Sequence, residues 1–132
     1  MADTIQFDLV SLEKLVASQP VEMVVVPGSE GDMGVLPGHS LLIGTIRPGV
    51  IDVHEGGNVT NRIFVSGGFV QVDPETCTVL ADEAVAVADI DKAAATDRLQ
   101  SAQKALADAG DDTRADAEAE VKVAEALVAA AG

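Results

Sequence analysis

Aromatic side chains are almost absent from this chain of 132 residues, which has no tryptophan, no tyrosine and three phenylalanines. A folded core must therefore be filled by valine, leucine and isoleucine, which pack well on a pleated sheet but supply few large anchors. We expect modest stability that depends strongly on any phenylalanine in the core. Truncating Phe7 or Phe69, if buried, should cost about 3 to 5 kcal/mol of stability.

Cysteine and histidine are also scarce, at one and two residues. No disulfide can form within the chain. Cys77 lies in an alternating, strand-like run and is expected to be a small buried residue, which fits a reducing compartment. His39 and His54 have no metal-ligand spacing with it, and the phosphate-binding GxxxxGK motif is missing. We therefore expect no metal site and no cofactor.

Basic residues are outnumbered, eight against twenty-two acidic residues, which gives a formal net charge of −14. This charge repels nucleic acids and anionic lipid headgroups, so nucleic-acid binding is not expected. No apolar run approaches the roughly 20 residues that span a bilayer, and the N-terminal residues do not resemble a secretory leader. The sequence predicts a soluble intracellular protein without direct membrane insertion, which can still lie beside a membrane.

Side chains that could carry catalysis do not form a known motif. His39 and Ser40 are adjacent, and neighbours in an extended segment point to opposite faces, so the imidazole does not reach the hydroxyl. Ser11 and Lys14 match an SxxK string that lacks its companion motifs. Asn58 begins a glycosylation sequon that is most simply a hairpin turn and strand. We expect no catalytic residue and no enzymatic activity of the chain itself.

Residues 1–88 have the pattern of short β-strands separated by glycine and proline turns. Apolar and polar residues alternate at residues 5–9, 51–54 and 69–73, as in half-buried strands. Turns are predicted at residues 48–49, 56–57, 67–68 and 73–74. Residues 21–26 and 41–46 are more continuously apolar, which predicts strands in the centre of the core. The segment as a whole predicts an antiparallel β-sandwich or flattened barrel.

Residues 89–132 differ sharply in composition, because alanine supplies fifteen of these forty-four residues and proline is absent. Alanine is the best helix former, so this region is predicted to be helical. Gly110 interrupts it, and Thr113 supplies a cap for a second segment. The fold class predicted for the whole chain is therefore α+β, a β-sandwich domain (1–88) followed by an α-helical hairpin domain (89–132). The two predicted helices would meet through alanine-rich faces that bury little apolar area, so the hairpin should be able to open.

Three motifs occur together: a glycine-rich segment at residues 31–40, too rich in glycine for regular structure, an SGGF hairpin at 66–69 and a TVLAD strand at 78–82. In this order and spacing they resemble the epsilon subunits of F-type ATP synthases, called delta in mitochondria. The resemblance covers the whole chain. It implies a non-catalytic rotor subunit of the central stalk, which couples the gamma subunit to the c-ring during proton-driven ATP synthesis. It also implies a peripheral location in the F1 sector, on the cytoplasmic face of the bacterial inner membrane.

The resemblance assigns interface roles to individual residues. The position of Asp32 is expected at the c-ring and that of His39 closer to gamma. The further candidates for the c-ring and gamma interface are Met33, Pro37 and Ser66.

The resemblance also implies two regulatory properties, neither of which the residues favour. Some bacterial relatives bind ATP through an Ile-Asp-x-x-Arg-Ala pattern; here Ile90 and Asp91 begin it, but Ala94 replaces the arginine that suits phosphate contacts. In bacterial relatives the hairpin can also extend along the central stalk towards the alpha/beta ring and hinder ATP hydrolysis. Residues 89–132 carry five basic and ten acidic groups, and 5 − 10 gives −5, which opposes docking on an acidic loop. Two alternatives to a rotor subunit stay open: an ATP-sensing regulatory module and a generic β-sandwich adaptor.

Overall fold

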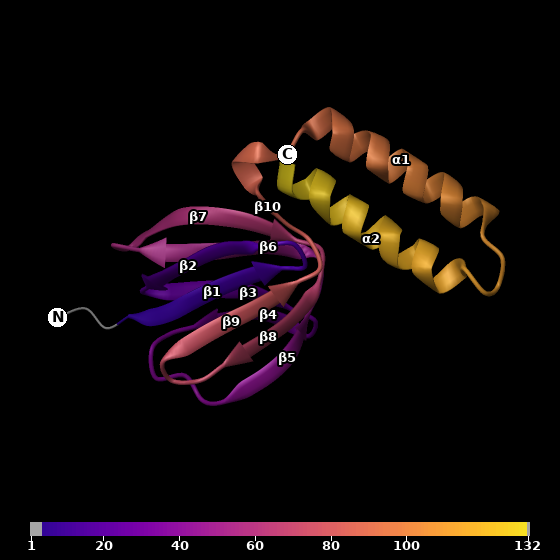
Figure 1. The fold of residues 1–132 in the computed structure, drawn as a ribbon. Helices are drawn as coiled ribbons and strands as arrows, with labels where there is room; N and C mark the ends of the chain where they lie inside the picture. The colour runs from indigo at the N-terminus through magenta and orange to yellow at the C-terminus, as the bar shows by residue number, and fades with distance from the viewer. Residues whose placement is uncertain (1–3, 132) are drawn as a thin grey trace.

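The polypeptide forms ten β-strands and then two α-helices within residues 4–131, the part of the chain that a computed structural model describes (Figure 1). The strands are β1 (Ile5–Ser11), β2 (Leu15–Val21), β3 (Met23–Gly28), β4 (Gly31–Val35), β5 (Leu42–Ile46), β6 (Gly49–Glu55), β7 (Asn58–Val65), β8 (Gly68–Val72), β9 (Thr76–Ala81) and β10 (Ala84–Ala86). A 3-10 turn, η1 (Val87–Asp89), leads into α1 (Lys92–Asp108) and α2 (Arg114–Ala131). The predicted α+β class is confirmed.

The strands form two layers that join into a nearly closed, flattened barrel. One layer has the order β10-β7-β6-β3-β4 and the other β5-β8-β9-β1-β2, and the two are joined at the single pair Gly28↔Ile46. On the far side, Gln19 of β2 donates to Glu55 of β6 at 3.0 Å. The prediction of an antiparallel sheet is wrong for one pair, because β1 and β9 run parallel. Alternation along a strand reports which face is buried and not the direction of its neighbour.

The core lies between the layers and contains aliphatic side chains from both. Ile5, Phe7 and Leu9 of β1 are all fully buried, which confirms the face predicted from their alternation. They pack with valines and isoleucines from the other strands, and with Cys77. Burial raises the pKa of the Cys77 thiol to about 12, so this side chain is an unreactive part of the core.

One prediction about the core is wrong, that of a central strand at residues 41–46. Phe69, whose burial was left open, is 58% exposed, while Phe64, in β7, is the second fully buried ring. In the apolar run at residues 41–46, Leu41 and Ile43 are 80% and 75% exposed, and Ile46 is buried. The strands β5 and β8 alternate with one face open to solvent, so a continuous apolar sequence did not mean burial on both faces.

The glycine-rich segment is more regular than predicted. Its first half is β4, which pairs with β3 from Val24↔Val35 to Gly28↔Gly31. The buried side chain of Val35 fixes this strand to the core. The turn follows it, at Gly38, whose φ of 86° suits glycine and whose N–H donates to the carbonyl of Pro74 at 2.8 Å.

The helical hairpin lies beside the sandwich, close to β7 and β10, with α2 packed against β6 (Figure 1). The two helices meet through small side chains, and the buried helical residues are Ala95, Ala102 and Ala124. The buried ring of Phe64 lies on the outer side of β7. Its neighbours along the strand, Ile63 and Val65, point into the core, and successive residues of a strand point to opposite faces. No helix within residues 4–131 has the length and apolar character needed to cross a bilayer.

Polar side chains lie at the start of each helix. Thr113 immediately precedes α2, and its hydroxyl accepts from the Gly110 N–H at 3.2 Å. Asp91 is the N-cap of α1, and its carboxylate accepts from the Ala94 N–H at 3.2 Å. The predicted division at residues 88 and 89 falls within η1. The ends of the two predicted domains, residues 1–3 and 132, lie outside the described residues.

Candidate functional site

The five interface candidates from the sequence lie in different parts of the chain. Asp32 and Met33 lie on β4, near the turn that joins it to β3, whereas Pro37 and His39 lie beyond the other end of β4. Ser66 lies between β7 and β8, and its N–H donates to the carbonyl of Glu83 at 3.1 Å. The five candidates therefore belong to three separate segments of the chain.

Asp32 is not a free acidic group. Its carboxylate accepts from the Arg47 guanidinium at 2.5 Å, and the same guanidinium donates to the Gly28 carbonyl at 2.5 Å. The pair is well exposed, so it contributes no more than about 1 kcal/mol to stability. Its geometric consequence is greater, because it fixes the β3–β4 turn against the segment that follows β5.

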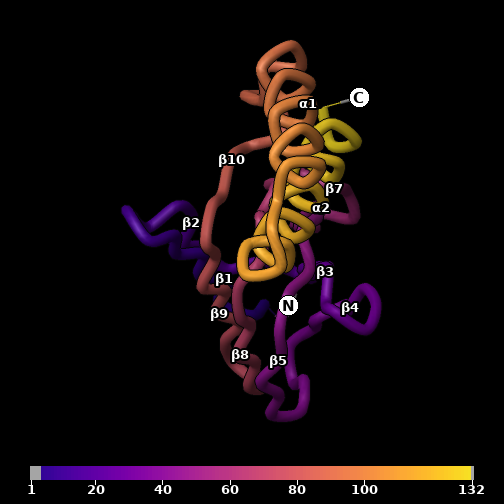
Figure 2. The backbone as a smooth tube through the Cα atoms, turned by 90° about the vertical axis from the view of Figure 1, so that its right-hand side faces the viewer, coloured from indigo at the N-terminus to yellow at the C-terminus, as the bar shows by residue number. Residues whose placement is uncertain are grey.

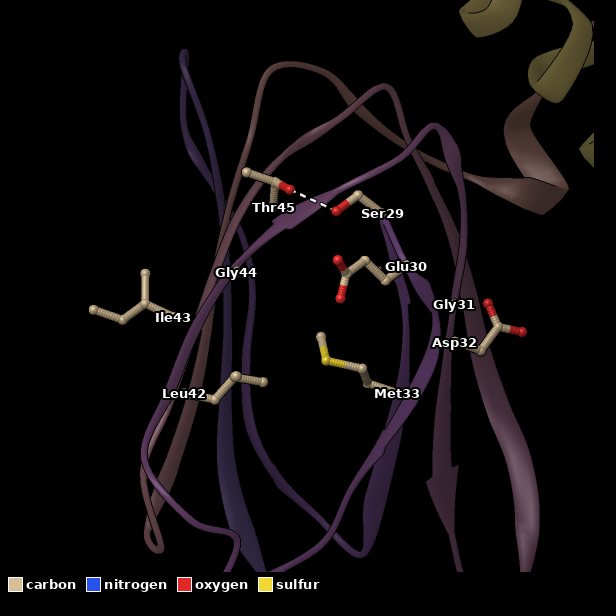
Figure 3. A pocket seen from close by; sticks show the side chains of 10 residues that line it. Ser29, Glu30, Gly31, Asp32, Met33, Leu42, Ile43, Gly44 and Thr45 are labelled. Carbon is tan, nitrogen blue, oxygen red and sulfur yellow. Dashed lines mark hydrogen bonds between the residues drawn. The ribbon is translucent and has the colours of Figure 1, made fainter.

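A recess of about 530 Å³ opens between the β3–β4 turn and β5 (Figure 3). The side chains of Glu30, Met33 and Leu42 point into it, and those of Asp32 and Ile43 point away. A hydrogen bond of 2.6 Å between the hydroxyls of Ser29 and Thr45 closes one end. The recess thus combines apolar walls with a single carboxylate.

An apolar surface covers the outer side of β5, β8 and β9. Phe69 of β8 and Leu80 of β9 are direct partners across the sheet, and Leu80 is 54% exposed. Ile43 lies on the adjacent strand β5, where its neighbour Thr45 pairs with Phe69. We call Ile43, Phe69 and Leu80 the outer apolar face. The central strand predicted at residues 41–46 would have buried Ile43, but β5 lies at an edge of its layer and its outer face is open to solvent.

His39 and Ser66 have the surroundings of structural residues. The His39 ring nitrogen Nδ1 is 2.7 Å from the carbonyl oxygen of Ser40, and the ring is half-buried. Ser66 is buried, and its hydroxyl has no hydrogen-bond partner within residues 4–131. No group of three metal-binding side chains occurs in the same part of the chain.

Ile90 and Asp91 line a recess of about 270 Å³ at the base of the hairpin, together with Asp89 and Arg98. The groups there are already engaged, because Asp91 caps α1 and Arg98 bonds to two glutamates. Ala94 also lines the recess, in place of the expected arginine. The arrangement offers carboxylates and no free cation for a nucleotide phosphate.

Residues 4–87 match the family described as ATP synthase, Delta/Epsilon chain, beta-sandwich domain. The chain belongs to this family. It is 50% identical over 131 residues to the ATP synthase epsilon chain of Rhodospirillum rubrum, with 98% of both chains covered. It has the same identity and coverage with the epsilon chain of Paramagnetospirillum magneticum. A chain in a Euglena gracilis mitochondrial ATP synthase structure containing OSCP, F1 and the c-ring superimposes with a TM-score of 0.84 at 26% identity, covering 98% of this chain and 82% of that one.

These relationships confirm the family inferred from the three motifs. The chain is an epsilon-type accessory subunit of an ATP synthase and part of the central stalk of the F1 sector. The generic adaptor and the ATP-sensing module, the two alternatives left open by the sequence, are not favoured.

Within this epsilon-type subunit, Arg98 ties the helical hairpin to the sandwich. Its guanidinium makes two hydrogen bonds to Glu83, at 2.8 and 3.1 Å, and two to Glu120 of α2, at 2.7 and 3.3 Å. Glu83 precedes β10, so one side chain joins α1, α2 and the sheet. These bonds raise the pKa of Arg98 and keep it charged.

Replacing Arg98 by alanine should loosen the hairpin. Loss of the four charge-assisted bonds should speed amide hydrogen exchange in residues 92–131 by roughly 3- to 10-fold, with residues 5–81 unchanged. Arg62→Ala is the matched control, because Arg62 pairs with Asp52 within the sheet. Hairpin exchange that stays at the wild-type rate in Arg98→Ala would contradict this role.

Proposed function

We propose that this subunit binds gamma and the c-ring and couples their rotation, without carrying out ATP chemistry itself. The observation that supports this most strongly is the outer apolar face, an uncovered patch of three large side chains on a rigid sheet. Exposed apolar patches of this kind typically bind another protein. We assign this face to gamma.

The sandwich suits mechanical coupling because it is stiff. Its core is fully buried and crosses both layers, and close-packed interiors transmit strain with little deformation. A partner held on the outer apolar face and another held near the β3–β4 turn would be connected through this core. We place Asp32, with its partner Arg47, at the c-ring contact and His39 at the gamma side.

The proposed location is peripheral, at the cytoplasmic face of the bacterial inner membrane. The c-ring contact would bring the subunit close to that membrane. A net charge of −14 gives it no electrostatic affinity for anionic headgroups, so protein contacts would hold it there.

For the helical hairpin we propose at most weak regulation of hydrolysis. Its charge of −5 disfavours docking on an acidic region of the alpha/beta ring, and Arg98 holds it against the sandwich. Glu83 and Glu120 would both lose their cationic partner if the hairpin swung away. Removing residues 89–132 should therefore leave ATP hydrolysis nearly unchanged, and a large rise would contradict the proposal.

The proposal is tested by reconstitution of a synthase depleted of its epsilon subunit. The wild-type chain should restore proton-driven ATP synthesis, and the double variant Asp32→Ala, His39→Ala should restore it less well. Asp32 is exposed and His39 is half-buried, so the isolated double variant should keep the circular dichroism and melting temperature of the wild-type chain. Full restoration by the double variant would reject the two residue assignments, and failure of the wild-type chain would reject the function.

A further inference from the structure

The strand β5 is an open edge of the sheet over most of its length. On one side it pairs with β8 at every residue from Leu42↔Val72 to Ile46↔Gly68. On the other side it pairs with β3 only at Gly28↔Ile46. Figure 2 shows β4 standing to the side of β5, and the recess of about 530 Å³ separates the two strands. The backbone of residues 42–44 is thus uncovered on the side that faces the recess.

Backbone alternation shows which groups are unused. The Thr45 carbonyl accepts from the Ser29 N–H at 3.0 Å, and the Arg47 N–H donates to the Pro27 carbonyl at 2.9 Å, so odd-numbered residues of this segment face β3. Every second residue of a strand presents its N–H and C=O to the same side. The N–H and C=O of Ile43 therefore point to the open side, where residues 4–131 provide no strand to pair with them.

This edge lacks the usual protection against pairing with other chains. Natural edge strands are protected by charged residues, especially lysine, or by proline. The sequence of β5 and the residue before it has none of these, and Leu41 and Ile43 are both largely exposed. An apolar, unguarded edge is a template for an added strand.

The recess beside the edge indicates the chemistry of the occupant. Glu30 points its carboxylate into the space, between the apolar walls formed by Met33 and Leu42 (Figure 3). The other nearby carboxylate, Asp32, is neutralised by Arg47 and points away. A long basic side chain fits this combination, because its aliphatic stem can cover the apolar walls while its charged end meets Glu30.

We propose that β5 is a docking edge that accepts an extended segment of another synthase subunit as an added antiparallel or parallel strand, with a lysine or arginine of that segment in the Glu30 recess. A second copy of this chain is a poorer occupant, because two molecules of charge −14 repel each other. The inference rests on the proposed function in one respect, that the segment belongs to a partner within the assembled synthase.

The test is amide hydrogen exchange at residues 41–45, compared between the free chain and the complete ATP synthase. An added strand should slow exchange of the Ile43 N–H by at least about 100-fold on assembly, because this N–H becomes a sheet hydrogen bond. If the chain co-purifies with the synthase but Ile43 exchanges as in the free chain, the docking edge is wrong and the proposed function stands. If the chain does not co-purify, both are wrong. Protection in the free chain that grows with its concentration would show self-association and overturn the assignment.

Two substitutions at Ile43 separate backbone pairing from side-chain contact. Ile43→Pro removes the outward N–H, which an edge position tolerates, and Ile43→Thr keeps it while making the side chain polar. Pairing predicts that the proline variant binds the depleted synthase at least about 10-fold more weakly than the threonine variant, and equal binding would overturn it. If the proline variant loses the circular dichroism of the wild-type chain, the exchange experiment decides alone.

The charge of the occupant is tested by Glu30→Gln. Loss of the carboxylate should weaken binding to the depleted synthase by about 5- to 20-fold at low salt, with a smaller difference at high salt. Asp52→Asn is the matched control, because it removes an acidic charge on β6 that does not line this recess. Binding equal to wild type in Glu30→Gln would reject the basic segment.

Discussion

Truncation of Phe7 to alanine should lower the free energy of unfolding by about 3 to 5 kcal/mol, which for a small domain is a large part of the total. Phe7 is fully buried in β1 and packs in a core with few other large side chains. Urea unfolding followed by circular dichroism measures the effect, since the chain has no tryptophan or tyrosine to report by fluorescence.

Phe69→Ala is the internal control for this result. The same chemical change at an exposed ring should cost less than about 1 kcal/mol, because little apolar area is removed from the interior. Equal losses at the two positions would contradict the assignment of Phe7 to the core and of Phe69 to the surface.

The second large effect is expected on assembly. Replacing Phe69 and Leu80 together by serine should weaken binding to gamma by about 100-fold, since each buried apolar anchor of an interface contributes roughly 1 to 2 kcal/mol. Both residues are more than half exposed in the free chain, so the fold should be retained. The measurement is a titration of gamma with the wild-type and variant chains.

Val59→Ser provides the comparison for the double variant. Val59 is an exposed apolar residue on β7, in the other layer from Phe69 and Leu80. It should leave the affinity for gamma unchanged. If Val59→Ser weakens binding as much as the double variant does, the interface is not the outer apolar face.

Local patterns predicted most of the fold. The alternation at residues 5–9 identified the buried face of β1, and the alanine-rich composition after residue 89 identified both helices. Composition gave a wrong prediction where the question was whether a strand is buried on one face or on both. Residues 41–46 are as apolar as a central strand, but whether a second layer covers them depends on strand order, which a single segment does not encode.

The candidate site was less predictable, because it depends on residues that are distant in sequence. Asp32 was identified by resemblance, but its partner Arg47 comes from another connection and is found only when β3, β4 and β5 are placed together. The same is true of Arg98, Glu83 and Glu120, which meet from three elements. Side-chain pairing between elements follows from tertiary packing, for which hydrophobic periodicity carries no signal.

The most direct test of a non-catalytic coupling subunit is binding of the full wild-type chain to a purified complex of gamma and the c-ring. We expect a stable stoichiometric complex that forms without nucleotide and does not hydrolyse ATP. Absence of a complex at micromolar concentrations of both partners, or turnover of ATP by the chain alone, would contradict the account.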